Sequence, residues 1–275
     1  MEASEASLQA NPSVGSARDY LELCLREWSA SHALLRAIEC RKLALHDLPS
    51  PVLDIGCGDG RLAGMLFDHP LAVGIDVNAK EVKSAQASGM YGRAVACDAR
   101  RLPLPDQSFA SVFSNCVLEH IPDLDQALAE ISRVLKPDGR LLTTVPLPEW
   151  EAEGPVPLLR RWGMGWACRL MNPLLRHLWK HVTLEGREQW EARLTRAGLQ
   201  LVTWEPYMGR HAFNVYGICL PGAFLSLVFK RTLGRSVLSR RLRRKLAPAL
   251  ARRLRPAFLA DDAHGVCALV LAIKR

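Results

Sequence analysis

Residues 52–60, which read VLDIGCGDG, constrain the fold of this chain more than any other stretch. An apolar run that leads into glycines at alternate positions is typical of a buried strand that turns sharply into a helix. Glycines in such a turn also let a ligand approach the main chain closely. The dinucleotide fingerprint would need a glycine where Arg61 stands, and the Gly-Lys-Ser/Thr of a phosphate loop is absent. The loop therefore predicts a nucleotide-like ligand, while a NAD-type site and a tight turn without a ligand stay open.

Short apolar runs alternate with helix-like segments around this loop. The sequence predicts strands at 52–55, 72–76, 94–97, 110–115, 140–145, 199–204 and 266–273. It predicts helices at 61–67, 79–88, 124–135 and 185–197, one or two more amphipathic helices within 18–46, and a turn at 136–139. Strands and helices that alternate at this spacing predict a parallel sheet covered on both faces.

Polar side chains stand where successive strands of this sheet end. Asp76 closes the second strand, twenty residues after Gly56, where a carboxylate can accept two hydrogen bonds from ribose hydroxyls. Asp98 closes the third strand and suits an adenine amino group, and Asn115-Cys116 close the fourth. A single polar residue at a strand end is more often a cap or turn residue. The series predicts one ligand crevice at the carboxyl edge of the sheet.

The segments VLDIGCGDG, VGIDVN, CDARRLPLPDQSFASVFSNCVLEHIPD and LKPDGRLLTTVP, in this order, resemble the class I S-adenosylmethionine-dependent methyltransferases, and among them the small-molecule and lipid-quinone subgroup. The resemblance covers roughly 50–146 and, more weakly, 185–205 and 264–275. It implies an α/β fold with a doubly wound, seven-stranded, mostly parallel Rossmann-like sheet, an antiparallel last strand and helical insertions. Ala110 and Leu104 depart from the usual Asp and Phe, at positions peripheral to the cofactor.

The same resemblance implies S-adenosyl-L-methionine as the cofactor and assigns residues to it. The loop beneath the methionine part would consist of Asp54, Gly56, Cys57, Gly58 and Gly60. Around the nucleoside, Asp76 would hold the ribose hydroxyls, Val77 would pack beside the adenine, and Asp98 and the backbone of Ala99 would read the adenine edge. Asn115 and Cys116 would line the pocket near the sulfonium.

Methyl transfer from a sulfonium is an in-line displacement, so alignment and exclusion of water supply most of the catalysis. A phenol, hydroxyl or enolisable carbon as acceptor would also need a base. His120, next to Glu119, is one catalytic candidate, and His181, in KHVTLEG, is a second. The alternative for His120 is a residue that packs or caps locally at a helix start.

The positive charge of the chain is concentrated in 206–260. This segment has twelve Lys or Arg and no Asp or Glu, and it accounts for the whole net charge of +8. Residues 212–229 carry no charge but are too short and too interrupted by Pro and Gly for a membrane span. Apolar and basic residues over 212–255 predict contact with an anionic membrane surface. One alternative is that the apolar part packs as a substrate cap and the arginines are solvated. Another is that the segment binds nucleic acid, although the apolar run would be of little use on a phosphate backbone.

We expect a disordered tail over 1–17 and one methyltransferase domain over 18–275. Its parts would be an N-terminal helical cap (18–48), a cofactor-binding half (50–146), a Trp-rich lid insertion (147–184) and a basic, apolar insertion (206–260). Eight scattered cysteines without a CxxC pair favour reduced thiols in a cytoplasmic protein and give no support for a metal site.

The expected function is O- or C-methylation of a small, lipophilic acceptor, with the protein peripheral on the membrane. Two alternatives remain. One is an RNA or protein methyltransferase that uses 206–260, which the absence of an Asn/Asp-Pro-Pro-Tyr/Phe motif disfavours. The other is a non-catalytic binding scaffold with the same fold, which the acidic strand ends disfavour.

Overall fold

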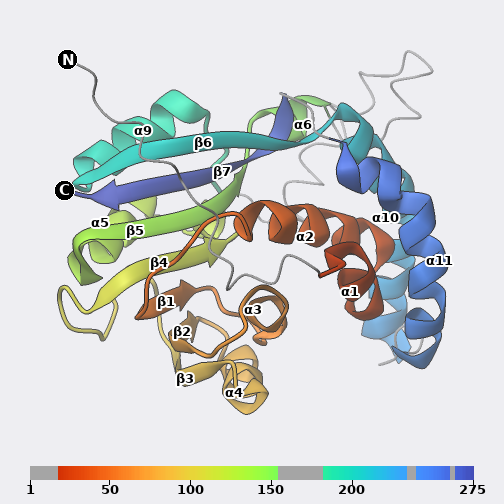
Figure 1. Cartoon of the computed structure of the whole chain (residues 1–275), viewed down its shortest axis with the longest axis horizontal. Coiled ribbons are helices and arrows are strands. Elements are labelled where there is room, and N and C mark those ends of the chain that lie inside the picture. The colour runs from red at the N-terminus through yellow and green to blue at the C-terminus, as the bar shows by residue number, and fades with distance from the viewer. Residues whose placement is uncertain (1–17, 154–181, 234–239, 261–263) are drawn as a thin grey trace.

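The computed structural model describes residues 18–153, 182–233, 240–260 and 264–275 (Figure 1). The expected tail over 1–17 and most of the Trp-rich lid insertion, with His181, lie outside these residues.

Seven of the described segments pair into one sheet. They are β1 (Val52–Ile55), β2 (Leu71–Asp76), β3 (Tyr91–Ala96), β4 (Phe109–Asn115), β5 (Leu135–Pro146), β6 (Leu199–Gly209) and β7 (Gly265–Lys274). The strand order is β3-β2-β1-β4-β5-β7-β6. The first five strands are parallel, whereas β7 runs antiparallel to both β5 and β6. This topology confirms the predicted fold class, including the antiparallel last strand. The order reverses between β1 and β4, which is where open α/β sheets bind ligands.

Helices cover both faces of the sheet and enclose two hydrophobic cores. On one face α5 (Leu124–Val134) and α9 (Arg187–Arg196) bury Leu128, Ile131 and Trp190 against the strands. The short helices α3 (Arg61–Leu66), α4 (Ala79–Ser88), α6 (Glu149–Glu153) and the 3-10 helix η1 (Leu118–His120) connect the strands. All four residues of β1 are buried, as expected for a central parallel strand covered on both faces.

Four further helices form a layer beside the sheet, on the right in Figure 1. They are α1 (Tyr20–Glu27), α2 (Ala30–Leu43), α10 (Arg210–Leu233) and α11 (Arg240–Leu259). On α11, Ala247, Ala251, Leu254 and Phe258 are buried at helical spacing. Arg255 Nη1 of the same helix donates to Asp19 Oδ1, just before α1, at 3.1 Å. The apolar stripe of the basic segment therefore packs inward, onto the N-terminal helices.

Two local differences from the sequence predictions have clear physical reasons. The turn at 136–139 lies inside β5, where Phe109 pairs with Leu135 but Ser111 pairs with Arg140, so the extra residues bulge out of the ladder. Pro221 lies inside α10 and does not end it. Packing of the buried Phe213 and Tyr216 side chains supports this helix despite the backbone hydrogen bond that a proline removes.

Across the described ranges, no helix combines the length and the apolar character that crossing a membrane requires.

Candidate functional site

The glycine loop after β1 has an unusual backbone that fixes its position. The three glycines all have left-handed φ angles, which are 77° at Gly56, 52° at Gly58 and 79° at Gly60. The N–H groups of Gly56 and Cys57 donate to the Ile75 carbonyl at 2.8 and 2.9 Å. A Cβ on Gly56 would lie 2.2 Å from Val117 Cγ2. Glycine at this position therefore lets the loop pack between the end of β2 and the segment that follows β4.

The corner between Gly58 and Asp76 is open. A Cβ on Gly58 would meet nothing within 4 Å. The Gly58 N–H donates to Asp76 Oδ2 at 3.1 Å, and the Asn78 N–H donates to Asp76 Oδ1 at 2.8 Å. Each carboxylate oxygen keeps a further lone pair for a ligand. Val77, beside this corner, is 77% exposed. The corner thus has free acceptor lone pairs and open space, and binding of the ribose by Asp76 and of the adenine beside Val77 stays a prediction.

Asp54 lies at the base of the loop and is buried. Tyr91 donates its hydroxyl proton to Asp54 Oδ2 at 2.6 Å. Burial raises the pKa of Asp54 to about 7, and the nearby Asp76 carboxylate acts in the same direction. Gly74 makes room for this pair, because a Cβ there would lie 2.8 Å from the Tyr91 ring. The sequence does not identify Tyr91 as part of the site, because its hydrogen-bond partner Asp54 lies 37 residues away in the chain.

Cys57 and Asp98 keep their side chains occupied within the protein. Cys57 is buried, and burial raises the pKa of its thiol, so only its backbone is suited to a ligand. The Arg100 guanidinium donates to Asp98 Oδ2 at 2.6 Å, and this hydrogen bond lowers the pKa of the Asp98 carboxyl. Ala99 is buried beneath the pair. Reading of an adenine edge by Asp98 and Ala99 remains a prediction.

The end of β4 is held by side-chain hydrogen bonds. Asn115 Nδ2 donates to Glu39 Oε2 at 3.0 Å, and Asn115 Oδ1 accepts from the Thr144 hydroxyl at 2.9 Å. Cys116 has a φ of 50°, unusual for a residue with a side chain, and its N–H donates to the Thr144 carbonyl at 3.1 Å. The Asn115 amide is therefore used within the protein, and lining of a pocket near the sulfonium by Asn115 and Cys116 stays a prediction.

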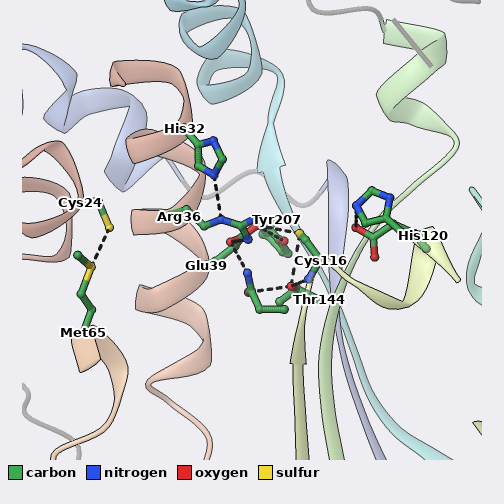
Figure 2. A network of polar contacts seen from close by, with 11 residues as sticks. Cys24, His32, Arg36, Glu39, Met65, Cys116, His120, Thr144 and Tyr207 are labelled. Carbon is green, nitrogen blue, oxygen red and sulfur yellow. Dashed lines mark hydrogen bonds and ion pairs between the residues drawn. The ribbon is translucent and has the colours of Figure 1, made fainter. Parts of the chain in front are cut away.

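Glu39 of α2 is the centre of this network, shown in Figure 2, and the sequence did not single it out. It is fully buried. Its Oε2 also accepts from Arg36 Nη1 at 2.7 Å, and its Oε1 accepts from Cys116 Sγ at 3.1 Å and the Tyr207 hydroxyl at 3.3 Å. A buried charge requires such partners. The only signal in the sequence is a carboxylate within the apolar stripe of a predicted helix, three residues after an arginine.

His120 and Glu119 lie on η1, directly after the end of β4. His120 Nε2 is 3.7 Å from Glu119 Oε1. The His120 side chain is 38% exposed, whereas that of Glu119 is 2% exposed. Burial raises the pKa of Glu119 to about 8. In Figure 2, His120 lies beyond Cys116 when viewed from Arg36. The predicted base is therefore accessible at the strand ends, with a buried acid behind it.

Residues 53–143 match the family model described as a methyltransferase domain. A malonyl-acyl-carrier-protein O-methyltransferase from Methylovorus sp. is 33% identical over 138 residues, which cover 44% of this chain and 47% of that protein. A demethylmenaquinone methyltransferase from Thermus thermophilus is 35% identical over 109 residues, covering 36% and 49%. The chain thus spans about half the length of the curated relatives it matches.

Solved structures share the fold over most of the chain. The cyclase SpnF superposes with a TM-score of 0.56 at 23% identity and covers 89% of this chain and 82% of its own. Phosphoethanolamine N-methyltransferase 2 from Haemonchus contortus, solved with S-adenosyl-L-methionine, gives 0.52 at 19% identity, covering 90% and 53%. Identities this low establish the fold alone.

The strand order and the left-handed glycine loop after β1 define a Rossmann-like fold. Within it, residues 53–143, which include the glycine loop, are similar to the methyltransferase domain family. S-adenosyl-L-methionine is the cofactor of this family.

Proposed function

We propose that the protein transfers a methyl group from S-adenosylmethionine to a small, lipophilic acceptor by O- or C-methylation. The observation that carries the proposal is the open corner at Gly58 and Asp76, with an accessible histidine at the end of a neighbouring strand. Two relatives support the acceptor class, because their names specify malonyl-acyl-carrier protein and demethylmenaquinone as what they methylate.

The residues at this edge of the sheet suit the cofactor. Its chemistry is to supply an electrophilic methyl group on a positively charged sulfur. Asp76 accepts hydrogen bonds from the ribose hydroxyls, and its charge, with that of Asp54 when ionised, favours a cationic ligand. The backbone of the glycine loop holds the methionine part, and the turn at Asn115-Cys116 limits the pocket near the sulfur.

His120 acts as the base in this proposal. Its imidazole, at the end of β4, accepts the proton of an acceptor hydroxyl or acidic carbon as the new bond to the methyl group forms. Alignment and exclusion of water supply the rest of the acceleration. His181, the second predicted base, lies outside the described residues and has no placed role.

Labelled product profiling tests the activity. The purified chain is incubated with S-adenosylmethionine carrying an isotopic methyl label and with a cell extract, which is then separated into lipid, RNA and protein fractions. We expect label in the lipid fraction with wild type and none with Asp76→Ala. Label in RNA or protein would support the alternative acceptors. Absence of label from every fraction, despite cofactor binding, would support a binding scaffold.

We also propose that the exposed side of α10 and α11 contacts an anionic membrane surface. Ile218 and Phe224 on α10 are 61% and 58% exposed, and Leu242 and Leu246 on α11 are 43% and 39% exposed. The exposed cations alongside them on α11 are Arg241, Arg244 and Lys245. Because the buried stripe of α11 packs on the N-terminal helices, the outer side of the described part of α11 is the one that can meet lipid. Exposed apolar and basic side chains together favour an anionic interface.

Liposome co-sedimentation tests the surface without disturbing the core. Deleting 212–255 would remove buried side chains such as Leu254, so the better variant is Phe224→Ser with Leu242→Ser. We expect wild type to bind vesicles containing phosphatidylserine, and the double variant to bind several-fold less. Val202→Ser, at a 52% exposed position on β6, is the control and should bind like wild type. Equal binding by all three would contradict the proposal, as would binding to RNA alone.

A further inference from the structure

The carboxyl group of Glu119 is sealed inside the protein at the end of β4. Its Oε2 atom is buried and has no hydrogen-bond partner among the described residues. Its Oε1 atom lies 3.7 Å from His120 Nε2. Leaving a buried acceptor unsatisfied costs about 1 to 3 kcal/mol, so the site retains this acid at the expense of stability. Such exceptions to polar satisfaction in a native structure call for a functional explanation.

The main chain around Glu119 holds it in place. The Glu119 carbonyl accepts from the N–H groups of Val182 and Thr183 at 2.9 and 3.0 Å. Leu118, next to it, is fully buried. The main chain at Glu119 is therefore anchored, while the side chain of the neighbouring His120 is 38% exposed.

Charged and titratable groups from three elements surround this acid. On α2, the cation of Arg36 favours the ionised form of Glu119, and the carboxylate of Glu39 disfavours it. The thiols of Cys116 and of Cys267, on β7, also lie within electrostatic range. His120 is the partner on the same helix. Among these groups, the imidazole is the accessible one that can exchange a proton with an acceptor near neutral pH.

We propose that Glu119 is a positioning residue for His120: when ionised, the Glu119 carboxylate accepts the Nε2–H of His120 and leaves Nδ1 as the unprotonated nitrogen that takes the acceptor's proton. The proposal rests on the function proposed above. In the step, the acceptor's O–H or C–H bond breaks and its proton goes to Nδ1. The electron pair left on the acceptor forms the bond to the methyl carbon, and the methyl–sulfur bond breaks toward sulfur. The ionised Glu119 stabilises the resulting imidazolium, which then returns its proton to water.

The separation of 3.7 Å between His120 Nε2 and Glu119 Oε1 is longer than a hydrogen bond. Catalytic hydrogen bonds are often long in ligand-free structures and shorten in the complex. The arrangement follows a general pattern in which a buried carboxylate selects one tautomer of a histidine base.

This arrangement predicts a coupled titration. The pKa of Glu119 is raised to about 8, above the value of about 6.5 for a free imidazole. Two interacting groups of this kind release their protons in two steps that belong to the pair. The nitrogen resonances of His120 should therefore report two inflections, the upper one near pH 8, with the Nε2–H tautomer dominant above it.

Long-range ¹⁵N–¹H spectra of histidine-labelled full-length protein test the proposal, with His120→Gln identifying the resonances. In Glu119→Gln we expect the upper inflection to disappear and the share of the Nε2–H tautomer to fall. Glu119→Asp keeps an ionisable group and should keep both inflections. One inflection in wild type, or titration curves unchanged in Glu119→Gln, would overturn the proposal.

Cofactor binding separates this proposal from the function on which it rests. Glu119→Gln should bind S-adenosylmethionine within about twofold of wild type, because Glu119 is not among the residues proposed to hold the cofactor. Failure of wild type to bind the cofactor would contradict the proposed function and leave the His120 titration as a separate result.

Discussion

Two glycines of the loop share a left-handed φ angle but differ in their surroundings. Gly56 packs against Val117, whereas Gly58 faces open space. Gly56→Ala therefore combines backbone strain of about 1–2 kcal/mol with a clash worth roughly 1–3 kcal/mol, whereas Gly58→Ala adds only the strain.

Urea unfolding should therefore show a larger loss of stability for Gly56→Ala than for Gly58→Ala. Calorimetry should show that Gly58→Ala, although the milder change for the fold, weakens S-adenosylmethionine binding at least tenfold, because its methyl group occupies the ligand's space. Unchanged cofactor affinity in Gly58→Ala would place the ligand elsewhere.

Asp54 makes stability depend on pH. Its pKa is about 7 in the folded state and about 3.8 as a model carboxyl group. Between these values the folded state binds more protons than the unfolded state, so this residue lowers stability as the pH rises from about 4 to 7. Asp54→Asn keeps an acceptor for Tyr91 and removes the ionisation. We expect the variant to gain roughly 1–3 kcal/mol relative to wild type between pH 5 and 8, as measured by urea unfolding.

The control for Asp54 is Asp106→Asn, at an exposed aspartate paired with Arg133 on the surface. Its pH profile of stability should stay close to that of wild type. A profile for Asp54→Asn that parallels wild type would mean that Asp54 stays ionised when buried.

At the scale of elements, the Arg36–Glu39 pair attaches α2 to the end of β4. Removing one member of a buried ion pair leaves the other charge uncompensated, which costs about 3–5 kcal/mol. Glu39→Ala should lose that much stability in urea unfolding. Glu22→Ala, which breaks a surface pair with Arg26 on α1, should lose less than about 1 kcal/mol. Similar losses in both variants would show that Glu39 does not bind the helix to the sheet.

The sequence predicts elements well where the pattern is local. The helix predicted over 79–88 coincides with α4, because Asn78 caps its start and Gly89 ends it in a left-handed conformation. The strand ends at Asp76 and Asn115 are also correct. By contrast, β6 continues to Gly209, five residues beyond its predicted end, because pairing with the distant β7 supports it there.

Residues that act through distant partners could not be predicted. Glu39, Thr144 and Tyr207 meet at one network from α2, β5 and β6, and each separately resembles an ordinary helix or strand residue. Likewise, composition shows that 206–260 is basic and apolar, but not that the stripe containing Ala251 and Phe258 is already used for packing. The partners of Glu39 and the packing of the α11 stripe both depend on contacts between distant parts of the chain, which form only in the folded protein.

At the scale of the whole molecule, the sheet carries the edge proposed to hold the cofactor, and the four-helix layer of α1, α2, α10 and α11 lies beside it (Figure 1). The methyltransferase family fold accounts for the first part. The second part carries the exposed surface proposed to meet lipid, and through α2 it also carries Glu39. The proposed lipid-contacting surface and Glu39 of the strand-end network therefore belong to the same helical layer.

The central claim is that the corner at Gly58 and Asp76 binds S-adenosylmethionine. Titration calorimetry of the full chain with S-adenosylmethionine and its demethylated product tests it most directly. We expect micromolar binding by wild type, a loss of about 100-fold in Asp76→Ala, since each hydrogen bond to a charged group contributes roughly 1.5–3 kcal/mol, and unchanged binding in Asp106→Ala. Equal affinity of Asp76→Ala and wild type would contradict the account.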